Sequence, residues 1–119
     1  MWKVMIVDDE KLICKLVQAL VEWDKLGMQM AAQAENAIQA LDMLQQYRPD
    51  ILITDIRMPG MDGLELIKNA KKICPELEII IISGYAHFEY ARNALSLGVG
   101  NYLLKPIKQD ELNETLRKI

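Results

Sequence analysis

The sequence predicts an α/β protein built on one five-stranded parallel sheet with helices on both faces. Along 119 residues, five short apolar segments alternate strictly with five longer segments of helical periodicity. Most of the apolar segments are continuous, which is typical of parallel strands covered on both faces. Right-handed crossovers between such strands distribute the helices over the two faces. The length corresponds to one domain, residues 1–119.

In the N-terminal half, the apolar run Val4–Val7 predicts the first strand. Helical spacing then predicts a helix that ends before Gly27. Its inward face consists of Leu12, Ile13, Leu16, Val17, Leu20 and Val21. The segment Met28–Ala34 alternates in polarity, which favours an edge strand. Asn36 is predicted to cap a second helix, whose inward residues are Ala37, Leu41 and Leu44.

In the C-terminal half, Ile51–Thr54 predicts the third strand, and a helix after Gly63 stops at Pro75. The four β-branched residues Ile79–Ile82 predict a buried central strand. A fourth helix, closed by Gly98, has the inward residues Phe88, Ala91 and Leu95. The last strand is Asn101–Leu104. A final helix starts near Lys108, with Asp110 and Glu111 in its first turn.

The composition argues against several classes of function. A net charge of −3 argues against direct binding of nucleic acid by this segment. No apolar run approaches the roughly 18 residues that span a membrane, and no signal peptide is present. Cys14 and Cys74 lie far apart without CxxC or histidine companions, which predicts free thiols in a reducing compartment. We therefore expect a cytoplasmic protein without membrane contact.

Polar residues follow four of the five predicted strands. They are Asp8 and Asp9 after the first, Asp55 after the third, Ser83 after the fourth and Lys105 after the fifth. The carboxyl ends of parallel strands lie at one edge of the sheet, where open α/β proteins bind their ligands. The sequence therefore predicts that these side chains converge.

The converging residue types indicate phosphoryl transfer. Carboxylates that meet repel one another unless a cation neutralises them, and oxygen ligands beside a phosphoryl group suit Mg²⁺. With the ion bound, Asp55 can act as a nucleophile toward phosphorus. Lys105 supplies a fixed positive charge and Ser83 a hydroxyl donor, and both stabilise the oxygens of a phosphoryl group during transfer.

These motifs resemble, over the whole chain, the receiver domain of two-component response regulators. The matching stretches are Asp8-Asp9, D-I-R-M-P-G-M-D-G from Asp55, Ser83-Gly84 and Tyr102-x-x-Lys105-Pro106. The resemblance implies a flavodoxin-like, doubly wound (βα)5 fold with strand order 2-1-3-4-5. It also implies that a sensor histidine kinase phosphorylates Asp55. The domain would then be no enzyme beyond catalysing its own phosphorylation and dephosphorylation.

The resemblance implies a magnesium site as well. Asp9, Asp55 and the backbone carbonyl of Arg57 would bind Mg²⁺ directly, and Asp8 would act through water. Arg57 and Tyr85 would also flank the phosphoryl site and influence how fast water reaches it, unless they face solvent without a role.

A switch is implied at the other side of the site. Lys105 would pair with the phosphoryl group and Ser83 would hydrogen-bond it. Tyr102 matches an aromatic residue that turns inward when Ser83 moves, although burial alone would also place an aromatic there. The Lys105–Pro106 peptide is expected to be cis. His87, the only histidine, is predicted to face solvent.

A narrower resemblance concerns residues 21–27, V-E-W-D-K-L-G, and the run S-G-Y-A-x-F-x-Y-A from Ser83. Both are similar to receivers of the YesN-like group, which precede an AraC-type helix-turn-helix domain. The resemblance implies that this domain was excised from a longer transcription regulator whose C-terminal DNA-binding output domain is absent here. Phosphorylation would change the face made by the fourth helix, fifth strand and last helix, and homodimerisation there stays open.

Three other functions fit parts of the pattern. A phosphohydrolase of the haloacid dehalogenase type needs an acid two residues after its nucleophile, where this chain has Arg57. A nucleotide-binding Rossmann domain needs a glycine-rich loop after the first strand, where this chain has residues 8–10, all acidic. A pseudo-receiver that binds partners without phosphorylation would not need the complete set of site residues.

Overall fold

The computed structural model describes residues 1–56, 63–84 and 101–119. It confirms a parallel sheet of five strands in the order β2-β1-β3-β4-β5. The strands are β1 (Trp2–Val7), β2 (Met28–Ala34), β3 (Ile51–Asp55), β4 (Glu78–Ser83) and β5 (Asn101–Leu104). The predicted edge strand, β2, lies at an edge of the sheet.

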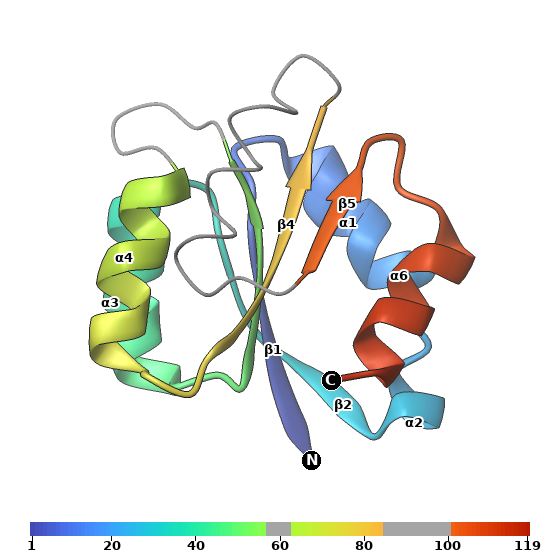
Figure 1. Ribbon diagram of the computed structural model, residues 1–119, viewed down its shortest axis with the longest axis horizontal. Coiled ribbons are helices and arrows are strands. Elements are labelled where there is room, and N and C mark those ends of the chain that lie inside the picture. Colours follow the sequence, from blue (N-terminus) through green and yellow to red (C-terminus); the bar gives the residue numbers. More distant parts are fainter. Residues whose placement is uncertain (57–62, 85–100) are drawn as a thin grey trace.

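Helices cover both faces of this sheet (Figure 1). The described helices are α1 (Lys11–Leu20), α2 (Trp23–Leu26), α3 (Ala37–Tyr47), α4 (Gly63–Ile73) and α6 (Gln109–Arg117). One core lies under α3 and α4, and a second lies under α1 and α6. The predicted helix with Phe88, Ala91 and Leu95, closed by Gly98, lies outside the described residues.

Alternate residues of each strand supply the two cores, as the pleat of a strand requires. In β1, Met5 belongs to the core under α3 and α4, whereas Val4 and Ile6 belong to the core under α1 and α6. All three side chains are at most 1% exposed. Burial on both faces explains why the strand is continuously apolar.

Two details of the first helix differ from the prediction. A single helix up to Gly27 was expected, but α1 ends at Leu20 and the short helix α2 follows it. Leu12 and Leu16 were expected to face inward, yet they are 77% and 39% exposed. Val17 is buried as expected, and the helix is rotated so that Cys14 is buried beside it in place of Leu12 and Leu16.

Asn113, a buried residue of α6, explains the break between α1 and α2. Its Oδ1 accepts a hydrogen bond from the Glu22 amide at 2.8 Å. Its Nδ2 donates to the carbonyl oxygens of Leu20 at 2.8 Å and Gln109 at 2.9 Å. Backbone groups freed by the interruption of the helix are thereby satisfied from the other end of the chain.

We expect Asn113→Ala to lower the free energy of unfolding by about 1.5 kcal/mol, because the partly buried Glu22 amide loses its partner and the Leu20 carbonyl keeps only the longer hydrogen bond from Gln109 Nε2. Urea denaturation measures the change. Thr115→Ala, which removes a hydroxyl bonded within α6 to the Glu111 carbonyl, is the control and should change stability by less than about 0.5 kcal/mol. Equal stability of the two variants would contradict the role given to Asn113.

Several smaller predictions are confirmed. Asn36 caps α3, since its Oδ1 accepts a hydrogen bond from the Gln39 amide at 2.8 Å. The Lys105–Pro106 peptide is cis. Cys14 and Cys74 are free thiols, the first buried and the second half-buried. Apart from these confirmed predictions, the helices in the described ranges include none with the length and apolarity to cross a membrane.

Candidate functional site

The register of the strands brings their carboxyl ends to one edge of the sheet. Val7 pairs with Thr54, and Asp55 pairs with Ile82 of the next strand. The residues that follow these pairs are therefore neighbours. At the far side, the Lys105 amide donates a hydrogen bond to the Ser83 carbonyl at 2.8 Å and fixes the end of β5 against β4.

Lys105 lies between two acidic side chains of this edge. Its Nζ is 3.6 Å from Oδ2 of Asp8 and 3.6 Å from Oδ2 of Asp55. The two carboxylates are almost fully buried, while the lysine is about one-fifth exposed. The predicted convergence of Asp8, Asp55 and Lys105 is thus present in the structure, and a single ammonium group bridges the two acids.

Backbone amides set the orientation of both carboxylates. Oδ1 of Asp55 accepts a hydrogen bond from the Ile56 amide at 2.8 Å. Oδ1 of Asp8 accepts one from the Glu10 amide at 2.9 Å. In each acid one oxygen is therefore held by the backbone, and the other oxygen faces Lys105.

The buried position of Asp8 changes its acidity. Burial, reinforced by the negative charge of Asp55, raises the pKa of Asp8 from 3.8 to about 6. The Glu10 amide and the charge of Lys105 oppose this shift without cancelling it. The charge of Lys105 therefore offsets only part of the effect of burying Asp8.

The residues present fit a magnesium ion. Carboxylate oxygens of Asp8, Asp9 and Glu10 lie within 4.8 Å of one another, so this group contains Glu10, which was not predicted as a ligand, and does not contain Asp55, which was. Asp9 is exposed toward solvent. Hard oxygen ligands of this kind suit Mg²⁺, which also retains several waters. Arg57, whose backbone carbonyl was predicted to complete the ligand set, lies outside the described residues.

Ser83 and Tyr102 line the β4–β5 side of the edge. Ser83 is fully buried, and its Oγ has no hydrogen-bond partner among the described residues. Tyr102 pairs with Ile81 in the sheet and packs against the core under α3 and α4. A buried hydroxyl without a partner is costly, which is consistent with a ligand for Ser83. Tyr85 and His87 lie outside the described residues.

Two residues that support Asp55 were not predicted. The buried Thr54 Oγ1 donates a hydrogen bond to the Asp55 carbonyl at 2.9 Å. Gly63, the first residue of α4, lies directly against the backbone of Asp55 and Ile56. Its amide donates a hydrogen bond to the Ile56 carbonyl at 2.7 Å. A polar residue in an apolar strand and a glycine at a helix start are the sequence signals for them.

Comparison with known proteins assigns this architecture to a family. The model of the response regulator receiver domain matches residues 4–117. The chain belongs to this family. As a receiver domain it is a component of two-component signalling, which agrees with the resemblance carried by its strand-end motifs.

Two solved structures of response regulators are similar to this receiver domain. The REC domain of AraT, a response regulator from Geobacillus stearothermophilus, has a TM-score of 0.94 at 40% identity and covers 98% of this chain and 91% of its own. A two component transcriptional regulator AraC from Clostridium phytofermentans has a TM-score of 0.92 at 36% identity, covering 99% and 92%.

Two curated relatives are longer than the receiver domain. The transcriptional regulatory protein YesN of Bacillus subtilis is 40% identical over all 119 residues, and HptR of Staphylococcus aureus is 33% identical over the same span. This chain spans 32% and 46% of their respective lengths. The similarity to the YesN-like group is thereby confirmed.

Proposed function

We propose that this receiver domain is a phosphorylation switch in which Asp55 accepts a phosphoryl group from a sensor histidine kinase. The observation that supports the proposal most directly is the buried, oriented Asp55 carboxylate with Oδ2 beside Lys105. An oxygen held in this way is positioned for attack, and the neighbouring cation stabilises charge that develops on the transferred group.

In the proposed step, a carboxylate oxygen of Asp55 forms a bond to phosphorus as the bond between phosphorus and the kinase histidine nitrogen breaks. The electron pair of the broken bond stays with that nitrogen, and the product is an aspartyl phosphate. Lys105 turns from the carboxylates to an oxygen of the phosphoryl group. The Ser83 hydroxyl donates to another oxygen, which gives its buried Oγ a partner.

Asp9, Asp55 and the carbonyl of Arg57 would hold Mg²⁺ directly, with Asp8 acting through water. The ion would supply positive charge that offsets the carboxylates and the incoming phosphoryl oxygens. The pKa of Asp8 near 6 supports this assignment, because burial disfavours the ionised form of Asp8 more than Lys105 and the Glu10 amide favour it.

Hydrolysis of the aspartyl phosphate would return the domain to its initial state, so it would act only on itself and on no separate substrate. The engagement of Ser83 would shift Tyr102, whose hydroxyl is already buried, and change the surface around β5 and α6. In the full-length protein this surface would control a C-terminal helix-turn-helix output domain. The names of the longer relatives, which are transcriptional regulatory proteins, support the step to transcription.

Incubation with Mg²⁺ and a small acyl phosphate should add one phosphoryl group to the wild-type domain, measured by intact-protein mass spectrometry. Asp55→Asn should gain none, and chelation of Mg²⁺ should abolish the gain. Asp50→Asn, which changes an exposed acid at the other end of β3, is the matched control and should be labelled like the wild type. Labelling of Asp55→Asn at the wild-type level would reject the proposal.

A further inference from the structure

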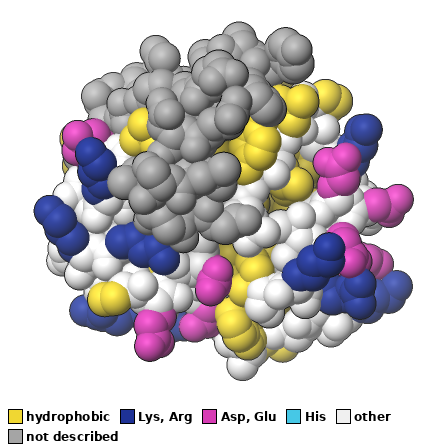
Figure 2. Space-filling view, in the orientation of Figure 1, with side chains coloured by type: hydrophobic (Ala, Val, Ile, Leu, Met, Phe, Trp, Pro, Cys, Tyr) yellow, Lys and Arg dark blue, Asp and Glu magenta, His cyan; other side chains and the backbone are white. Residues whose placement is uncertain are grey.

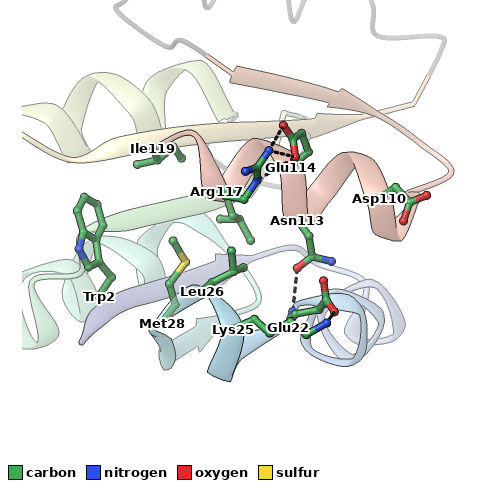
Figure 3. A pocket seen from close by; sticks show the side chains of 11 residues that line it. Trp2, Glu22, Lys25, Leu26, Met28, Asp110, Asn113, Glu114, Arg117 and Ile119 are labelled. Atoms are coloured by element: carbon green, nitrogen blue, oxygen red, sulfur yellow. Dashed lines mark hydrogen bonds and ion pairs between the residues drawn. The ribbon is translucent and has the colours of Figure 1, made fainter.

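A groove of about 550 Å³ opens at the end of the domain opposite the candidate site. It lies between α2, α6 and the beginnings of β1 and β2, near the C-terminus (Figures 1 and 3). Its apolar lining consists of Trp2, Leu26, Met28, Leu116 and Ile119. Because the site lies at the carboxyl ends of the strands and the groove at their amino ends, the two are separate features.

The apolar lining combines a buried floor with an exposed wall. Met28 and Leu116 are 5% and 0% exposed and belong to the core under α1 and α6. Trp2 remains 45% exposed, and Figure 3 shows it next to Met28. Figure 2 shows hydrophobic side chains reaching the surface in a seam between the charged sides of the molecule. An exposed tryptophan beside a concave apolar floor is typical of an interaction site.

The charged rim of the groove is largely neutralised by its own ion pairs. Lys25 Nζ is 3.1 Å from Oε2 of Glu22. Arg117 Nη2 is 2.6 Å from Oε1 of Glu114 (Figure 3). Four charges of the rim are therefore paired with each other, so an occupant of the groove needs apolar side chains more than complementary charge.

The chain itself leads into this groove. Helix α6 ends at Arg117, and the Ile119 amide donates a hydrogen bond to the Leu116 carbonyl at 3.2 Å. Ile119 is itself part of the apolar lining and packs against the core under α1 and α6. The curated relatives extend well beyond the part that this domain matches. A segment that followed Ile119 would therefore begin at the lining of the groove.

We propose that the groove binds the segment that directly follows Ile119 in the full-length protein, with an apolar side chain of that segment packed against Trp2. The proposal rests on the proposed function in one respect, the presence of an output domain after Ile119. Docking would attach the linker to α2 and α6 together, which Asn113 already joins. A displacement of α6 would then move the docked linker as well.

Hydroxyl-radical footprinting, read by peptide mass spectrometry, tests the proposal on the unmodified Trp2 side chain. Three forms of the protein are needed: residues 1–119, the same domain with about ten further native residues, and the full-length protein. A segment docked about nine-tenths of the time should slow oxidation of Trp2 about tenfold in both longer forms. Leu12, 77% exposed and absent from the groove lining, should be oxidised equally in all three.

Limited proteolysis of the full-length protein gives a second measurement. Trp2→Ser should increase the rate of cleavage just after Ile119, whereas Leu12→Ser, the same kind of change on α1, should not. Equal oxidation of Trp2 in all forms would overturn the proposal. So would protection that fades on dilution, which indicates a second copy, or protection only in the full-length protein, which indicates the output domain.

The phosphorylation experiment separates this proposal from the proposed function. A protein that is phosphorylated on Asp55 but leaves Trp2 fully reactive overturns only the docking. A protein that protects Trp2 but takes up no phosphoryl group overturns only the switch.

Discussion

Gly63→Ala is expected to lower the free energy of unfolding by about 3 kcal/mol. A Cβ atom at this position would lie 2.7 Å from both the Cα and the carbonyl oxygen of Ile56, and 2.8 Å from the carbonyl oxygen of Asp55. These neighbours are backbone atoms, so no side-chain rotation relieves the overlap. The start of α4 would have to move away from the end of β3, which urea denaturation measures as lost stability.

The same substitution should impair the candidate site in molecules that remain folded. The Ile56 amide donates to Oδ1 of Asp55, so a shift of Ile56 turns the carboxylate that we propose as phosphoacceptor. Labelling by an acyl phosphate in the presence of Mg²⁺ should therefore slow at temperatures well below the unfolding transition.

Two other glycines provide matched controls. A Cβ atom at Gly84, which follows β4 at the same edge, would meet no heavy atom of the described residues within 4 Å, so Gly84→Ala should leave stability nearly unchanged. Gly27 also has open space but a φ of +67°, and Gly27→Ala should cost about 1 kcal/mol from backbone strain alone. If Gly63→Ala proved no more harmful than Gly84→Ala, the steric argument would be wrong.

The fold followed from the sequence because its strongest signals are local. The side chains of Ile79–Ile82 can all be buried only if helices cover both faces of the strand. The alternation of such segments with helices then restricts the topology to few choices. The break after Leu20 could not be predicted in the same way. It depends on Asn113, whose partner Glu22 is 91 positions away in the sequence, and no local pattern near Leu20 reports that contact.

The site was predictable to the level of which residues converge. Parallel strands place Asp8, Asp55 and Lys105 at one edge whatever their rotamers. The bridging position of the Lys105 ammonium group, 3.6 Å from each acid, depends on rotamers and on the backbone amides that orient both carboxylates. Such short-range geometry is set by packing in three dimensions, and only the structure shows it.

Asp8→Asn is expected to stabilise the metal-free domain at pH 7 by about 3 kcal/mol. The pKa of Asp8 rises from 3.8 to about 6 in the folded state, mainly through burial, and each pKa unit corresponds to about 1.4 kcal/mol. The ionised form of Asp8 therefore opposes folding. An asparagine removes the charge and keeps an oxygen that can accept the Glu10 amide hydrogen bond.

The sign of this effect fixes its dependence on pH. Because the folded state binds the Asp8 proton more tightly, the stability that protonated Asp8 contributes is fully present below pH 3.8 and is lost as pH rises through about 6. The advantage of Asp8→Asn should thus be largest above pH 6 and vanish below pH 4. Urea denaturation over this range measures it, with Asp42→Asn, an exposed acid of α3, as a control that should show little difference.

Without metal, Asp8→Asn should be more stable than the wild type. Mg²⁺ should reverse this order of stability, because stabilisation by the ion requires ionised carboxylates. Millimolar Mg²⁺ is expected to raise the unfolding temperature of the wild type at pH 7, since a ligand that binds only the folded state stabilises it by mass action. The unfolding temperature of Asp8→Asn should barely change, and its labelling by an acyl phosphate should be weak. Two results would contradict this account of Asp8. One is an Asp8→Asn variant that is no more stable than the wild type without metal, and the other is a variant that Mg²⁺ stabilises as much as the wild type.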